Sequence, residues 1–83
     1  ENNLSDWFVY PNPSTDGNFT IKSNLNPSDI LSITVTDVTG NVVREFNSSD
    51  YESEIQVSDL SAALYIVRLQ KTNTIESKKI IVY

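Results

Sequence analysis

The stretch LYIVRLQ at residues 64–70 is the longest apolar-rich segment of this 83-residue chain. It is rich in β-branched and aromatic side chains, which is typical of a strand in the middle of a sheet. Because side chains alternate between the two faces of a strand, Tyr65, Val67 and Leu69 are predicted to share one face. An extended segment of this length spans roughly 23 Å, enough to cross a small domain. We therefore expect this strand to form the centre of the fold.

Six further segments have strand character and are separated by turn signals at a spacing of about 8–12 residues. They are residues 7–10, 18–22, 30–37, 42–46, 54–57 and 75–83. This pattern predicts an all-β fold, an immunoglobulin-like β-sandwich of about seven antiparallel strands with Greek-key connections. The polar residues 1–6 are predicted to be a linker end, which leaves residues 7–83 as one domain. Residues 58–63 are predicted to cross between the sheets, with room for one helical turn.

Alternation within two of these segments predicts which side chains face the core. Phe19 and Ile21 alternate with polar residues and are predicted to point inward. Leu31, Ile33 and Val35 are predicted to share the buried face of the next strand.

Three turns have distinctive sequences. Two prolines in YPNP, residues 10–13, fix φ and remove two backbone donors, which ends the first strand. Gly17 is placed for a left-handed backbone conformation. The DVTGN sequence at residues 37–41 predicts the bulged turn of a β-hairpin.

Composition excludes several classes of function. The net charge of −5 argues against a nucleic-acid-binding surface, and no apolar run approaches the ~20 residues that span a bilayer. We therefore expect no nucleic-acid partner and no direct membrane insertion. The chain has no cysteine, so it has no disulfide or thiolate metal site. Since it begins with Glu1 and contains no methionine, we expect it to be a fragment of a longer protein.

Catalytic chemistry has little support. Histidine and cysteine are both absent, which removes the commonest general base, the thiolate nucleophile and most zinc sites. A pair of acidic side chains could still act as general acid and base. However, the short loops contain too few residues to form a substrate cleft. Residues 16–18 lack the alternating ligands and closing glutamate of a calcium loop, so we interpret them as a turn. We predict that the chain is not an enzyme and has no cofactor and no metal site.

The first-strand aromatic residues and Tyr65 each have two interpretations, one functional and one structural. Trp7, Phe8 and Tyr10 could form a platform that binds sugars, or could simply pack in the core and at the sheet edge. Tyr65 follows Leu60 by five residues and could form a tyrosine corner, in which the hydroxyl group bonds to nearby backbone. Ordinary core packing of the Tyr65 ring is compatible with that arrangement.

In combination, the motifs of residues 7–83 resemble the type A C-terminal sorting domain of the type IX secretion system of Bacteroidetes. That family has a YPNP-like turn, a G-x-F-x-I strand, a D-x-x-G hairpin, an L-x-x-G-x-Y segment and a Lys-rich, apolar last strand. In this chain Ala63 stands at the glycine of the fourth motif. The matching residues are Tyr10, Pro11, Asn12, Pro13, Gly17, Phe19, Ile21, Asp37, Gly40, Leu60, Tyr65, Lys78, Lys79, Ile80, Ile81 and Val82.

The resemblance implies a C-terminal sorting signal. Such a domain directs an N-terminal cargo domain of the same precursor through the type IX secretion translocon across the outer membrane. A surface peptidase usually removes the domain afterwards. The expected partners are therefore the outer-membrane translocon, the surface peptidase and the cargo. The expected location is the periplasm in transit and then the cell surface or the medium.

Residues 77–83 and the turn at residues 11–13 are our hypothesis for part of the recognised surface. Strand addition at an exposed sheet edge is the docking mode that we expect. The opposing interpretation is that only the fold requires these residues. The alternative function is an immunoglobulin-like accessory module that binds carbohydrate or acts as a spacer.

Overall fold

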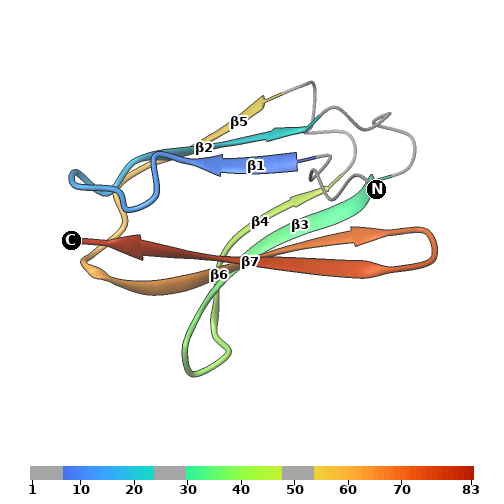
Figure 1. Cartoon of the computed structure of the whole chain (residues 1–83). Helices are drawn as coiled ribbons and strands as arrows, with labels where there is room; N and C mark the ends of the chain where they lie inside the picture. Colours follow the sequence, from blue (N-terminus) through green and yellow to red (C-terminus); the bar gives the residue numbers. More distant parts are fainter. Residues whose placement is uncertain (1–6, 24–29, 48–53) are drawn as a thin grey trace, which may run out of the picture.

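A computed structural model describes residues 7–23, 30–47 and 54–83, and within these ranges it consists of strands and connections (Figure 1). The all-β sandwich predicted from the sequence is confirmed. The predicted linker end at residues 1–6 lies outside the described residues, as do the connections at residues 24–29 and 48–53. The strands are β1 (Trp7–Tyr10), β2 (Phe19–Ser23), β3 (Ile30–Asp37), β4 (Val42–Asn47), β5 (Glu54–Val57), β6 (Ala63–Lys71) and β7 (Ile75–Val82).

Two antiparallel sheets form the layers of the sandwich. The smaller sheet has the order β1-β2-β5 and the larger one the order β4-β3-β6-β7. Strand β6 pairs with β3 on one side and with β7 on the other, so it lies inside the larger sheet, as its sequence predicts. Residues 58–62 connect the two sheets. They do not form the short helical turn that the sequence allowed there. No helix of the described ranges is long and apolar enough to cross a membrane.

The core lies between the sheets and is built from alternate residues of each strand. Tyr65, Val67 and Leu69 are buried on one face of β6, which confirms the predicted inner face of this strand. The prediction for Phe19 and Ile21 on β2 is also confirmed, since both are buried. The other buried hydrophobic residues are Trp7, Ile30, Ile33, Val35, Ile55, Val57, Ile80 and Val82.

The predicted inner face of β3 is wrong at one residue, Leu31. Its side chain is 48% exposed, whereas Ile30 is buried. The pairing of β3 with β6 is irregular here, because Ile30 opposes Lys71 while Ser32 opposes the preceding residue, Gln70. This bulge adds one residue to β3 and therefore reverses the alternation at the start of the strand.

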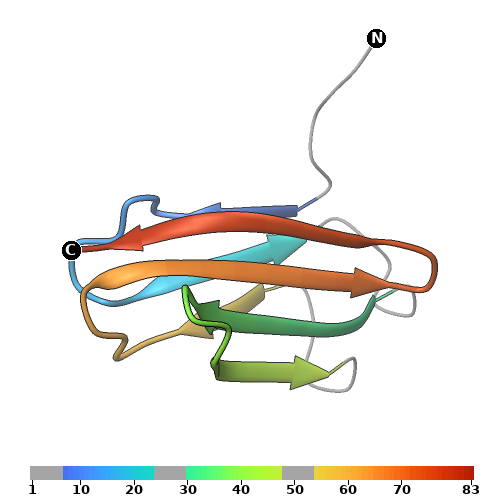
Figure 2. The same ribbon diagram turned by 90° about the horizontal axis from the view of Figure 1, so that it is seen from below.

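One end of the sandwich gathers three connections and the end of β7 (Figures 1 and 2). The antiparallel register places Asp37 opposite Tyr65, and Ala63 opposite Val82, so the β3–β4 turn, the start of β6 and the end of β7 lie together. The loop between β1 and β2 reaches the same end. Strand β1 begins toward the opposite end, where the β6–β7 hairpin is drawn in orange and red (Figure 2). Its first residue, Trp7, contacts Glu76 next to that hairpin.

Candidate functional site

The YPNP turn is fastened to the last strand by the side chain of Asn12. Its Nδ2 atom donates to the carbonyl oxygen of Lys79 across 2.9 Å, and its Oδ1 atom accepts from the backbone nitrogen of Ile81 across 3.3 Å. One side-chain amide thus makes the pair of hydrogen bonds that a neighbouring strand would make. The structure therefore brings together the two segments that we predicted to share a surface.

Ser14 continues this contact along β7 with its backbone. Its nitrogen donates to the carbonyl oxygen of Ile81 across 2.8 Å, and its own carbonyl oxygen accepts from the nitrogen of Tyr83 across 2.9 Å. The result is a short parallel bridge between Ser14 and Val82. This half of the β7 edge is occupied by the chain itself, so our expectation of an exposed edge for strand addition is wrong there. No motif pointed to Ser14, because a lone buried serine has no sequence signature.

Gly17 contacts the segment that precedes β6 at close range. Its carbonyl oxygen accepts from the nitrogen of Leu60 across 3.2 Å, and its φ is +80°, which confirms the predicted left-handed conformation. A Cβ atom at this position would lie 2.6 Å from the carbonyl oxygen of Leu60. Only glycine permits this approach, and the contact joins two motif residues that are far apart in sequence.

The residues next to Gly17 form a turn around one carboxylate. Asp16 accepts hydrogen bonds at Oδ1 from the backbone nitrogen of Asn18 at 3.0 Å and from the hydroxyl group of Ser14 at 3.4 Å. The side-chain oxygen of Asn18 accepts from the nitrogen of Asp59 across 3.2 Å. These bonds support our interpretation of residues 16–18 as a turn. In the part of the chain that the structure describes, no three acidic side chains are grouped to hold a metal ion.

Asp37 organises the β3–β4 turn with its carboxylate. Oδ1 accepts from the nitrogen of Thr39 at 2.9 Å, from its hydroxyl group at 2.6 Å and from the nitrogen of Asn41 at 3.0 Å. The hydrogen bond from the Thr39 hydroxyl group is the main cause that lowers the pKa of Asp37, followed by the bond from the backbone amide of Asn41. Both bonds stabilise the ionised carboxylate. Gly40 completes the turn with φ at +93°. Register is shifted between Val35 and Thr36, which confirms the predicted bulged hairpin.

Tyr65 forms the predicted tyrosine corner. Its ring is buried, and its hydroxyl group donates to the carbonyl oxygen of Ser61 across 2.7 Å. Ala63 is the first residue of β6, and its φ is not positive. The sorting-domain motif that this chain resembles has glycine at this position. Alanine is therefore accommodated at this position without backbone strain.

The motif residues include a buried set, whose members contribute to the core between the sheets, and an exposed set. Asp37, Leu60 and Lys78 are half-buried, and Gly17 is buried outside this core. The Nζ atom of Lys78 lies 5.1 Å from the centre of the Trp7 ring. The buried set is Phe19, Ile21, Tyr65, Ile80 and Val82, and the exposed set includes Tyr10, Pro11, Asn12, Pro13, Lys79 and Ile81.

Of the two interpretations of the first-strand aromatic residues, core packing is confirmed for Trp7. This side chain is fully buried, and its Nε1 atom donates to Oε1 of Glu76 across 2.9 Å. Phe8 and Tyr10 are 41% and 42% exposed on the outer face of β1. Among the described residues, these are the two aromatic rings exposed on this face.

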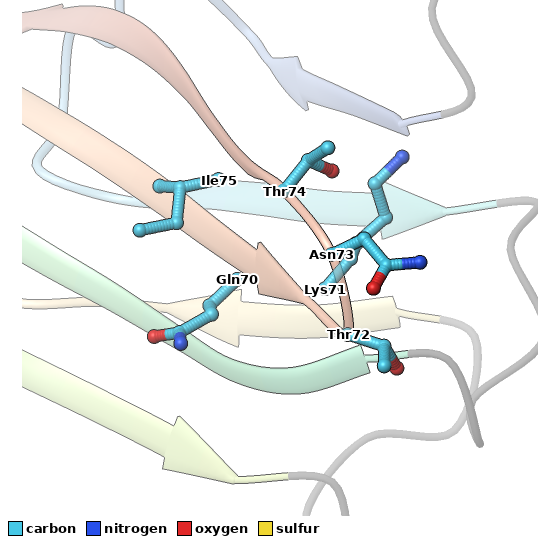
Figure 3. Close-up of a pocket in the computed structure, with 6 residues that line it drawn as sticks. All are labelled: Gln70, Lys71, Thr72, Asn73, Thr74 and Ile75. Atoms are coloured by element: carbon cyan, nitrogen blue, oxygen red, sulfur yellow. The ribbon is translucent and has the colours of Figure 1, made fainter.

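The end of the sandwich near Trp7 contains an ion pair and a shallow hollow. Lys71 contacts Oε2 of Glu76 across 2.6 Å, and its hydrogen bond is the main cause that lowers the pKa of Glu76. Residues 70–75 of the β6–β7 hairpin line the hollow, and their side chains splay outward (Figure 3). The hollow is open to solvent, and the described residues that line it all come from this one hairpin, so they do not form the enclosure of a substrate site.

A comparison with protein families gives one match that covers nearly the whole chain. The family model of the secretion system C-terminal sorting domain matches residues 8–83. No curated protein matches the sequence. The family match spans β2 to β7, all of β1 except Trp7, and all the motif residues described above.

Proposed function

Because this chain belongs to the secretion system C-terminal sorting domains, a family that marks proteins for type IX secretion, we propose that it directs its own cargo through the outer-membrane translocon. Family membership identifies a sorting signal, attached to a cargo at its N-terminal side, that leads to the cell surface or the medium. The proposed route passes through the periplasm. Removal by a surface peptidase follows, and the boundary between linker and domain lies near residue 7.

One observation supports this function most strongly, which is that motif residues distant in sequence meet at one end of the sandwich. Asn12 bonds to β7, and Gly17 contacts Leu60. Trp7, the first residue of β1, contacts Glu76 near the β6–β7 hairpin at the other end. A cargo joined before Trp7 would leave the motif end accessible to a receptor.

We further propose that the exposed motif residues form part of the recognised surface. Buried members such as Ile80 and Val82 are explained by packing, whereas Pro11, Pro13 and Lys79 are exposed and their side chains make no contribution to the core. The bonds of Asn12 to β7 place the proline turn beside Lys79. The geometry therefore supports a continuous surface made by the turn and the last strand.

A fusion of the 83 residues to a periplasm-directed fluorescent protein tests the function in a bacterium with a working type IX system. We expect the reporter to reach the surface or the medium, as it does with an established sorting domain. Retention of the reporter in the periplasm, while the established domain exports it, would contradict the proposal. Deletion of the last strand is uninformative, because it removes Ile80 and Val82 from the core.

The exposed pair Phe8 and Tyr10 favours one alternative function, an accessory module that binds carbohydrate. Two aromatic rings on one sheet face can stack on sugar rings. A module of this kind would bind polysaccharide through Phe8 and Tyr10 and would give no export of the reporter. The fusion experiment therefore distinguishes the two functions.

A further inference from the structure

The outer face of the larger sheet contains an apolar patch at the motif end. The register places Val42 opposite Thr36, Thr36 opposite Ile66, and Ile66 opposite Lys79, so these four side chains form one row across all four strands. They lie on the outer face because the alternate residues of β6, such as Val67, are buried in the core. A second row pairs Leu64 with Ile81. We name these six residues the outer-face patch: Thr36, Val42, Leu64, Ile66, Lys79 and Ile81.

The apolar members of the outer-face patch cover one another incompletely. Val42 is 56% exposed and Ile81 is 42% exposed, whereas Leu64 and Ile66 are half-buried. Thr36 is only 7% exposed although it points away from the core, so the neighbouring side chains must shield it. The patch is therefore a packed apolar surface rather than a set of isolated side chains, and such surfaces mark interaction sites.

The charged residues beside the patch on the outer faces of β6 and β7 are positive, and Glu45 on β4 is the acidic residue in the cross-strand row of Arg68. Arg68 and Lys79 project from the outer faces of β6 and β7, where their cross-strand partners are Ser77 and Ile66. No acidic residue lies on the outer face of β6 or β7, although the whole chain has a net charge of −5. A partner that complements this surface therefore needs carboxylates around an apolar centre.

We propose that the outer-face patch is the docking site of a folded protein partner whose acidic groups pair with Arg68 and Lys79. Asn12 and Ser14 occupy the adjacent edge of β7, so the partner packs on the face of the sheet rather than adding a strand. A second copy of this chain complements the surface poorly. In a two-fold dimer both copies present the same face, and its strands carry one exposed carboxylate, Glu45, against the positive charges of Arg68 and Lys79. This inference rests on the proposed sorting function and assigns the surface that its receptor contacts.

The test measures export of the reporter fusion for charge variants with a matched control. The double change Arg68→Glu and Lys79→Glu is compared with Lys22→Glu, which reverses a charge on the outer face of the other sheet. We expect the double variant to lower the exported fraction about fivefold or more, the loss expected when interface anchors are changed, while Lys22→Glu exports normally. Equal export of the double variant and the parent would overturn the docking site.

A second pair of variants tests whether the apolar side chains of the outer-face patch contribute to docking. Ile81→Ser changes the patch, and Ile75→Ser changes an exposed isoleucine at the far end of β7. We expect reduced export for Ile81→Ser only, with the thermal unfolding midpoints of both purified variants measured to show that they are folded. If both are folded and lose export equally, the patch is not the docking site. If the parent fusion itself is retained in the periplasm, the sorting function fails, which is a different outcome.

Discussion

The side-chain amide of Asn12 donates to the backbone carbonyl oxygen of Lys79 across 2.9 Å, although 67 residues separate them in sequence. This contact joins the first turn of the domain to its last strand. It explains why the two ends of the sequence carry motifs that belong together. The bond also closes part of a sheet edge that would otherwise attract other strands.

We expect Asn12→Ala to destabilise the domain by about 1 kcal/mol, because it removes two partly exposed hydrogen bonds. Equilibrium unfolding in urea measures this change. Asn73→Ala, on the exposed β6–β7 hairpin, is the matched control and should change stability by less than about 0.5 kcal/mol. Equal stability of the two variants would show that Asn12 does not hold the last strand.

The two glycines of the chain should respond differently to alanine. Gly17→Ala forces a left-handed alanine and a Cβ atom 2.6 Å from Leu60, so we expect a loss of about 2 kcal/mol or more. Gly40 also has a positive φ, but no atom lies within 4 Å of its Cβ position, so Gly40→Ala should cost only about 1 kcal/mol. Urea unfolding of both variants gives the comparison. A larger loss at Gly40 would contradict this account of the Gly17 contact.

Removal of the Tyr65 hydroxyl group separates the tyrosine corner from core packing. Tyr65→Phe keeps the buried ring and loses the bond to Ser61, so we expect a loss of about 1 kcal/mol in the free energy of unfolding. Tyr83→Phe, at an exposed tyrosine, is the control. An unchanged stability of Tyr65→Phe would mean that the ring alone accounts for this residue.

Acid should destabilise the domain through Asp37. Its pKa in the folded state is lowered, chiefly by the Thr39 hydroxyl group. The stabilisation from the Asp37 carboxylate is therefore fully present at pH values above its pKa in the unfolded chain, which is about 4. It is lost as the pH falls through the lower pKa of the folded state. Glu76 acts in the same direction because Lys71 lowers its pKa. Urea unfolding between about pH 6 and pH 2 should show this loss of stability.

Thr39→Val tests the cause of the lowered pKa directly. The change removes the hydroxyl donor, so the pKa of Asp37 should rise toward its ordinary value, as measured by NMR titration of the carboxyl group. Thr74→Val on the β6–β7 hairpin is the control and should leave the Asp37 titration unchanged. A pKa that does not move in Thr39→Val would assign the shift to the backbone amides.

Local sequence signals predicted those parts of the structure that depend on neighbouring residues. Alternation identified the inner faces of β2 and β6, because a half-buried strand exposes every second side chain. Gly17, and the turn that Asp37 begins, could be predicted because their backbone conformations limit the choice of residue. The failure at Leu31 has a physical cause, since a bulge reverses alternation and leaves no mark in composition.

Contacts between distant segments could not be predicted in this way. The bridge from Ser14 to Val82 and the bonds from Asn12 to β7 depend on how the two sheets are stacked. The sequence could not decide between a ligand platform and core packing for Trp7, because aromatic residues at a strand start are compatible with both. The outer-face patch also required the register, since Val42 and Ile66 are brought into one row only by Thr36 on the single strand between them, β3.

The central claim is that these residues act as a sorting signal, and the dependence of export on the translocon tests it most directly. The measurement is the fraction of a reporter fused to residues 1–83 that lies outside the outer membrane. It is compared between a strain with a working type IX translocon and one whose translocon is inactivated. We predict that the reporter appears outside only when the translocon works. Retention in the periplasm of both strains, or release by both, would contradict the claim.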